Sequence, residues 1–124
     1  MEKETPAMKL GYFRLRGRAQ VARLILEYLA VPYENIIFET KRQWEKYLTE
    51  NKQKYPLLNI PFLIDGDLVI TEAVPICLYV IRKSKKVDLI GRNIKDTSVL
   101  NMYIWSIDNL GVALVKLCWM PGKP

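Results

Sequence analysis

Residues 58–76, LNIPFLIDGDLVITEAVPI, decide the fold of this chain. Two short apolar runs, residues 62–64 and 68–70, flank Asp65-Gly66, a pair that tolerates the positive φ of a tight hairpin turn. Pro75 falls in the first turn of the next segment, where a helix tolerates proline. The stretch therefore predicts a β-hairpin followed by a helix over residues 74–83, with basic residues at its negative end.

Pro61 is expected at the first position of the first hairpin strand, where a missing N–H costs little. The Ile60–Pro61 peptide bond is either trans or cis. If it is cis, the backbone of Ile60 turns outward and can pair with an extended peptide. The sequence leaves this choice open.

The residues before the hairpin predict two strands and two helices. Residues 8–13 and 33–39 are short and mostly apolar, and between them apolar residues repeat at helical spacing from Gln20 to Leu29. A parallel strand pair with a right-handed crossover is expected. Thr40 is the predicted N-cap of a helix that ends near Gln53. The order β-α-β-α-β-β-α over residues 8–83 predicts an α/β domain with a thioredoxin-like fold.

Residues 84–91 are predicted to be a linker, and residues 96–119 one long helix. This helix is apolar on more than one face, so one small domain cannot cover it, and further helices or another chain must do so. Residues 92–124 are therefore expected to begin a second, truncated helical domain. Residues 1–7 are expected to form a flexible tail.

Composition excludes several classes of function. The 124 residues include no histidine, which removes imidazole chemistry and most zinc sites, so no metal is expected. The net charge of +6 favours anionic ligands, but the basic residues are scattered without interleaved aromatics, so nucleic acid is not the expected partner. No apolar run approaches a membrane span, the charged start is unlike a signal peptide, and the two cysteines lie far apart, which predicts a reduced, cytoplasmic setting.

Six segments, in order, resemble cytosolic glutathione transferases, most closely the mu class. They are residues 10–13 (LGYF), 15–20 (LRGRAQ), 23–28 (RLILEY), 43–44 (QW), 59–66 (NIPFLIDG) and 71–73 (TEA). The resemblance spans Leu10 to about Arg82, the thioredoxin-like half of that family. Only the first helix of the family's larger helical half would be present.

The resemblance implies that the nucleophile is the thiol of glutathione, the co-substrate, with Tyr12 as the catalytic residue at the end of the first strand. A tyrosine hydroxyl at a helix N-terminus can donate a hydrogen bond to the thiolate and so favour its formation. The alternative for Tyr12 is a strand tyrosine that packs in the core. The implied glutathione contacts are Phe13, Arg16, Trp44, Asn59, Ile60, Pro61, Glu72 and Ala73.

Some of these residues also fit a purely structural or solvent-exposed role. Trp44 is equally a core residue on an amphipathic helix. Arg16, Arg18 and Arg23 are expected to be solvated cations, although Arg16 could hold an anion near the rim of the pocket.

Two departures from the family pattern weaken the implied glutathione site. Glu72-Ala73 replaces a glutamine-serine pair that grips the γ-glutamyl carboxylate, so the serine hydroxyl is lost. Leu48 stands where mu-class members usually place a lysine for the glycine carboxylate. Losing two or three charge-assisted bonds of about 1.5–3 kcal/mol each would weaken binding by several powers of ten.

Two functions follow from the resemblance. One is a glutathione transferase that conjugates glutathione to small electrophiles in detoxification, as a homodimer. The alternative is a catalytically degenerate module in a larger assembly that covers the 96–119 helix. A glutathione-dependent thiol reductase would need a cysteine near Tyr12, and the sequence has none there.

Overall fold

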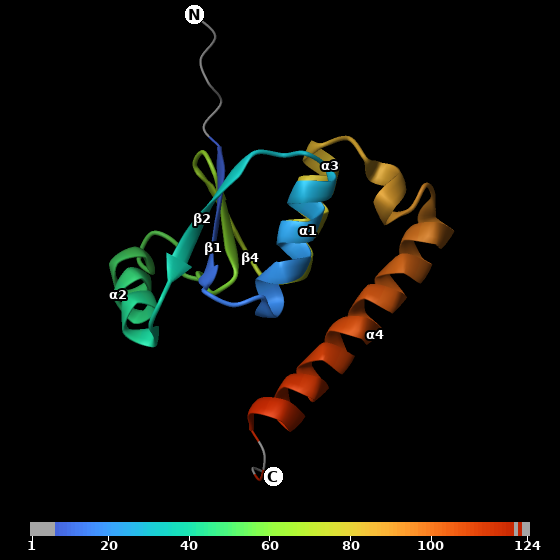
Figure 1. Cartoon of the computed structure of the whole chain (residues 1–124). Helices are drawn as coiled ribbons and strands as arrows, with labels where there is room; N and C mark the ends of the chain where they lie inside the picture. The colour runs from blue at the N-terminus through green and yellow to red at the C-terminus, as the bar shows by residue number, and fades with distance from the viewer. Residues whose placement is uncertain (1–6, 121, 123–124) are drawn as a thin grey trace, which may run out of the picture. The chain divides into compact units, whose positions relative to one another are not determined.

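A four-stranded mixed sheet forms the centre of the first unit, which ends at Lys85 (Figure 1). The structure is a computed structural model that describes residues 7–120 and 122. Strand order is β2-β1-β3-β4, with β1 and β2 parallel and the other two pairs antiparallel. The strands are β1 (Met8–Phe13), β2 (Tyr33–Phe38), β3 (Phe62–Asp65) and β4 (Leu68–Thr71).

The helices of this unit cover both faces of the sheet. Helix α2 lies on one side, and α1 and α3 lie together on the other (Figure 1). Their bounds are η1 (Gly17–Ala19), α1 (Gln20–Tyr28), α2 (Lys41–Asn51) and α3 (Ala73–Lys83), where η1 is a short 3-10 turn that runs into α1. The predicted β-α-β-α-β-β-α order and thioredoxin-like α/β fold are confirmed.

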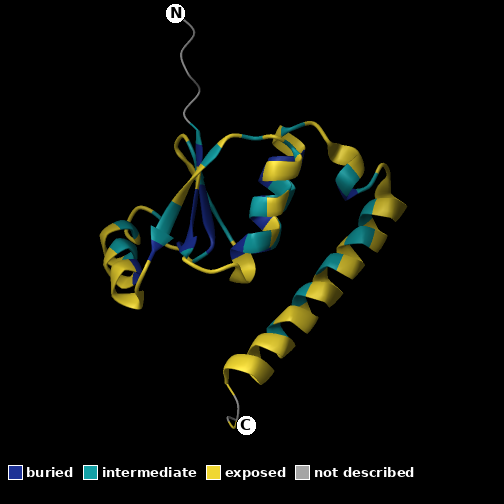
Figure 2. Ribbon diagram, viewed as in Figure 1, coloured by how far each residue is buried: buried dark blue, intermediate teal, exposed yellow. Residues whose placement is uncertain are grey.

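Each face of the sheet has its own apolar core, because alternate strand residues point to opposite faces. Met8, Leu10 and Tyr12 of β1 face α1 and α3. On the α2 side, Phe38, Trp44 and other aromatic residues form the second core. In Figure 2 the two central strands, β1 and β3, carry most of the buried positions of the sheet, whereas β2 and β4 at its edges are mainly intermediate or exposed.

Local signals in the sequence are followed closely. Thr40 caps α2 through a capping box in which its hydroxyl accepts from the Gln43 N–H at 3.3 Å. Gly66 turns the hairpin with φ 59°, and the Ile60–Pro61 peptide bond is cis, which decides the alternative that the sequence left open. Pro61 directly precedes β3 rather than opening it.

One side-chain cluster ties the end of β3 to α3. The carboxylate of Asp65 accepts hydrogen bonds from the Tyr79 hydroxyl and the Lys83 ammonium. Because Asp65 bonds Lys83 and Tyr79, its pKa lies below its ordinary value, while the bond to Asp65 raises the pKa of both Lys83 and Tyr79. No local pattern in the sequence indicates this cluster, because Asp65 lies 14 and 18 positions from its partners.

The second unit begins at Lys86 and consists of η2 (Val87–Ile90) and α4 (Ile94–Trp119). The predicted linker thus contains a short 3-10 helix. Helix α4 starts two residues earlier than predicted because the Asn93 side chain caps it, accepting from the Asp96 N–H at 2.9 Å. No residue of α4 is buried (Figure 2).

Helix α4 reaches the length and composition of a membrane-spanning helix, with a mean hydropathy of 1.2 in its apolar window. The sequence was expected to contain no membrane span because it has no uninterrupted apolar run of that length. Helix α4 reaches the length and mean hydropathy of a span because its apolar residues are interrupted by few charges. Core helices of soluble domains share both properties, so the helix by itself does not identify a membrane protein.

Candidate functional site

Tyr12 lies near the end of β1 with its side chain between the sheet and the start of α1. Tyr12 is 8% exposed, and its hydroxyl oxygen accepts a hydrogen bond from the backbone N–H of Arg18 at 3.2 Å. Arg18 lies in η1, whose N–H groups carry the positive end of the helix dipole. The phenol oxygen therefore has a donor on one side, while its own proton is available for another acceptor.

The loop between β1 and η1 is held by Arg23, one of the three arginines expected to be solvated cations. Arg23 is half-buried, and its Nη1 donates to the carbonyl oxygen of Leu15 at 3.0 Å and to that of Arg16 at 3.5 Å. It also reaches Gln20 Oε1 at 3.4 Å. The expectation for Arg23 was wrong, because its guanidinium crosses from α1 to backbone carbonyls that only the folded loop places there.

A second group of predicted site residues meets before β3 and α3. Asn59 Nδ2 donates to Glu72 Oε1 at 3.2 Å, and Asn59 Oδ1 accepts from the Ile60 N–H at 2.9 Å. The Glu72 N–H donates to the Pro61 carbonyl at 3.2 Å. Glu72 itself has a positive φ of 74°. These four residues therefore form one connected polar corner.

Trp44 packs in an aromatic cluster. It is 8% exposed and lies near the rings of Phe38, with centroids 5.4 Å apart, and Phe62, 6.1 Å apart. No hydrogen bond of its indole joins the described residues, which contain no buried side-chain nitrogen or oxygen without a partner. The indole N–H therefore reaches the surface, where it can donate to a ligand.

Phe13 and Ile60 connect the two groups. Both are partly buried and pack against the core that contains Tyr12 as well as the core that contains Trp44. Arg16 is different: it is exposed, and within the described part of the chain its guanidinium makes no hydrogen bond or ion pair.

The structure shows what surrounds the two positions that depart from the family pattern, Ala73 after Glu72 and Leu48. Ala73 is 4% exposed at the first position of α3, whose N-cap residue Glu72 makes no side-chain capping bond. Pro75 removes one further N–H from the first turn. Leu48 is half-buried against the aromatic cluster, so its side chain contributes packing there. The α3 start thus offers few donors for an anion.

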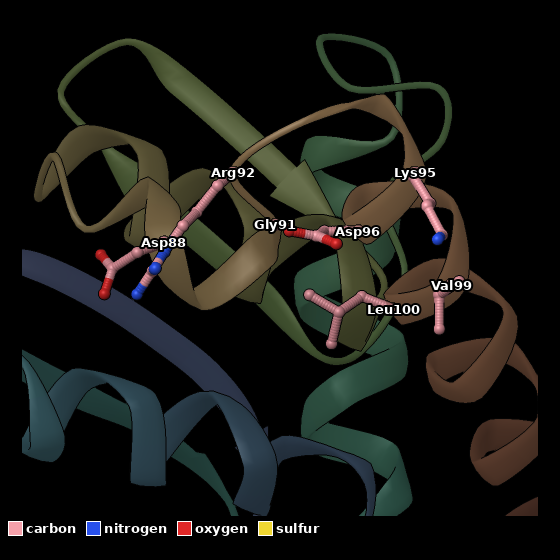
Figure 3. Close-up of a pocket in the computed structure, with 7 residues that line it drawn as sticks. All are labelled: Asp88, Gly91, Arg92, Lys95, Asp96, Val99 and Leu100. Atoms are coloured by element: carbon pink, nitrogen blue, oxygen red, sulfur yellow. The ribbon is translucent and has the colours of Figure 1, made fainter.

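Three further features bear on other possible sites. In the second unit, η2 and the start of α4 line a depression of about 490 Å³ (Figure 3). Its charged lining residues are two cations, Arg92 and Lys95, and two carboxylates, Asp88 and Asp96, so no single charge dominates. Burial raises the pKa of the Cys77 thiol to about 11. Among the described residues, no group of three potential metal ligands occurs.

The fold defines the class of this protein as a thioredoxin-like α/β domain. The family model of the glutathione S-transferase N-terminal domain matches residues 8–82, more than half of the chain. The chain therefore belongs to the glutathione S-transferase family.

Curated relatives include class-mu enzymes at modest identity. The chain is 27% identical over 113 residues to the class-mu 26 kDa isozyme 51 of Fasciola hepatica, covering 91% of this chain and 50% of the relative. It is 32% identical over 95 residues to a class-mu 26 kDa isozyme of Schistosoma japonicum (75% and 41%). Against glutathione S-transferase 2 of Gallus gallus, identity is 30% over 121 residues (90% and 52%). The chain thus spans about half the length of the curated relatives it matches.

Solved structures show the same fold. Rat hPGDS complexed with a quinoline has a TM-score of 0.73 at 26% identity, over 95% of this chain and 54% of that one. A Nu-class glutathione transferase of Haemonchus contortus has a TM-score of 0.67 at 23% identity, over 83% and 47%. The relatives carry the names of enzymes, so the comparisons do not favour the alternative of a degenerate scaffold.

Proposed function

We propose that this chain binds reduced glutathione and activates its thiol for conjugation to small electrophiles. The observation that carries the proposal is the Tyr12 hydroxyl, hydrogen-bonded by the Arg18 N–H at the start of η1. An N–H that donates to the phenol oxygen makes the phenol proton a better donor, which stabilises a thiolate placed against it.

The reaction needs one deprotonation and one displacement. The thiol of glutathione loses its proton to solvent, and the Tyr12 O–H donates a hydrogen bond to the resulting thiolate. The sulfur lone pair then forms a bond to the electrophilic carbon, and the leaving group departs with its bonding electron pair. The role of Tyr12 is thus to favour the thiolate by hydrogen bonding rather than to remove the proton.

Glutathione would lie along the polar corner. The Ile60 N–H, now bonded to Asn59 Oδ1, would turn to the cysteine backbone of the tripeptide. Phe13, Pro61 and Ala73 would pack beside it, Arg16 would stand at the rim, and the Trp44 indole would donate at the glycine end. The carboxylate of Glu72 would face the γ-glutamyl ammonium.

The proposal extends to organisation and setting. We assign residues 8–83 to glutathione binding and residues 92–124 to the start of the helical domain that supplies the electrophile pocket. A homodimer, or a larger assembly, would cover the apolar faces over residues 96–119. A cytoplasmic role in detoxification follows from the same resemblance.

Titration calorimetry of the whole chain with reduced glutathione at low salt tests the proposal. We expect a dissociation constant below about 1 mM, a binding free energy of about 4 kcal/mol or more. No detectable binding by folded protein would overturn the proposed function.

The Tyr12→Phe variant tests the role of the hydroxyl. Glutathione affinity should stay nearly unchanged, while the thiolate fraction of bound glutathione, measured by ultraviolet absorbance, should fall about tenfold to hundredfold, because a hydrogen bond to a charged group contributes about 1.5–3 kcal/mol. Tyr28→Phe is the matched control, since Tyr28 is 73% exposed at the far end of α1. An equal thiolate fraction in both variants would refute the assignment of Tyr12.

A further inference from the structure

Gly17 is the first residue of η1 and lies against the Tyr12 side chain. A Cβ atom at this position would lie 2.5 Å from Cδ1 of Leu15, 2.6 Å from the Tyr12 hydroxyl oxygen and 2.9 Å from Cε1 of the Tyr12 ring. All three distances are shorter than real Cβ contacts, so any side chain at residue 17 would displace the Leu15 side chain together with the phenol or the loop.

The loop has little freedom to move instead. Arg23 donates to the carbonyls of Leu15 and Arg16, immediately before Gly17. After Gly17, its own carbonyl accepts from the Gln20 N–H, and Ala19 is fully buried. Leu15 is 49% exposed, so its side chain can turn into solvent and relieve its own contact. Because both sides of the loop are held, the contact that remains would displace the ring of Tyr12.

We propose that Gly17 is a positioning residue for Tyr12: its missing side chain lets the phenol oxygen come within hydrogen-bond distance of the Arg18 N–H. This inference rests on the proposed function for its consequence, since a displaced hydroxyl would no longer meet the glutathione thiolate. Its structural part, that residue 17 sets the place of the Tyr12 ring, stands independently.

The chain offers a matched control for the backbone effect. Gly17 has φ 41° and Gly66 has φ 59°, both in the left-handed region that favours glycine, but a Cβ on Gly66 would meet nothing within 4 Å. Gly66→Ala therefore introduces comparable backbone strain without a clash. Any effect peculiar to Gly17→Ala is then an effect of the added methyl group.

The experiment is a double-mutant cycle in the whole chain, with Gly17→Ala, Tyr12→Phe, their combination, and Gly66→Ala. The first readout is the resonance of Tyr12 in protein labelled with fluorotyrosine, and the second is the thiolate fraction of bound glutathione beside its dissociation constant. Gly17→Ala should shift the Tyr12 resonance and lower the thiolate fraction about tenfold, with the dissociation constant within about threefold. In the Tyr12→Phe background it should change the thiolate fraction less than about twofold.

Each result bears on one claim. An unshifted Tyr12 resonance, or a thiolate fraction equal to that of Gly66→Ala, would overturn the inference while leaving the proposed function in place. A further tenfold loss in the Tyr12→Phe background would also overturn it, because Gly17 would then act by another route. If the unaltered chain binds no glutathione, the proposed function fails and the resonance alone decides the positioning role.

Discussion

Replacing Asp65 by asparagine should destabilise the protein at neutral pH and remove part of its acid sensitivity. The side chain of Asp65 is only 10% exposed and accepts from both Tyr79 and Lys83. The Lys83 side chain is 45% exposed, so its ion pair contributes at most about 1 kcal/mol after solvent screening. The Tyr79 bond to a carboxylate adds about 1–2 kcal/mol, and the variant should lose about 1–3 kcal/mol in total.

The pH dependence follows from the direction of the pKa shifts. The pKa of Asp65 is lowered in the folded state, chiefly by the hydrogen bond from Lys83. Its contribution is therefore complete above the unfolded value of about 4 and disappears as the pH falls through the lower folded value. The pKa of Lys83 is raised by Asp65, so on the alkaline side the contribution persists below about pH 10 and declines above it.

Urea unfolding followed by circular dichroism measures this difference at several pH values. The gap in unfolding free energy between the parent and Asp65→Asn should be largest near neutral pH and should narrow as the pH falls below about 4. Glu50→Gln is the control, because its pair with Lys46 is exposed (58% and 77%) and should contribute less than about 0.5 kcal/mol. Equal stability at neutral pH, or a gap that persists unchanged in acid, would refute the reasoning.

Three further outcomes are expected. Glu72→Gln should weaken glutathione binding about fivefold but leave unchanged the calorimetric affinity for an analogue without the γ-glutamyl ammonium. Equal weakening of both ligands would contradict the proposed pairing of the Glu72 carboxylate with that ammonium. Because the pKa of Cys77 is raised to about 11, about 0.01% of this thiol is thiolate at neutral pH. Mass spectrometry should therefore find iodoacetamide on Cys118 first and on Cys77 only after unfolding. Equal rates of modification at the two cysteines would show that burial does not protect Cys77. Gly11→Ala places a Cβ 2.1 Å from the Phe62 ring and should lower the free energy of unfolding, measured in urea, by about 1–3 kcal/mol. Adding Phe62→Leu should relieve part of this loss. Independent, additive losses from the two substitutions would argue against a clash between the new Cβ and the Phe62 ring.

Much of the fold that carries the candidate site follows from local sequence. The turn at Asp65-Gly66, the Thr40 cap and the end of β1 at Tyr12 and Phe13 each depend on a few neighbouring residues. The resemblance then orders these pieces into one family, and the match over residues 8–82 agrees with it. Residue roles at Trp44, Asn59 and Glu72 stay predictions, to be tested by binding.

The sequence by itself determined the order of the elements, their approximate bounds and the family, because turn chemistry, capping and hydrophobic spacing act within a few residues. Only the tertiary structure decided what the polar side chains meet. Asp65 bonds residues 14 and 18 positions away, and Asn59 bonds Glu72, 13 positions away. Likewise, the clearance that Gly17 leaves for the Tyr12 hydroxyl exists only once β1 and η1 are packed together. Such contacts carry no local signal, since they depend on how strands and helices pack rather than on neighbouring residues.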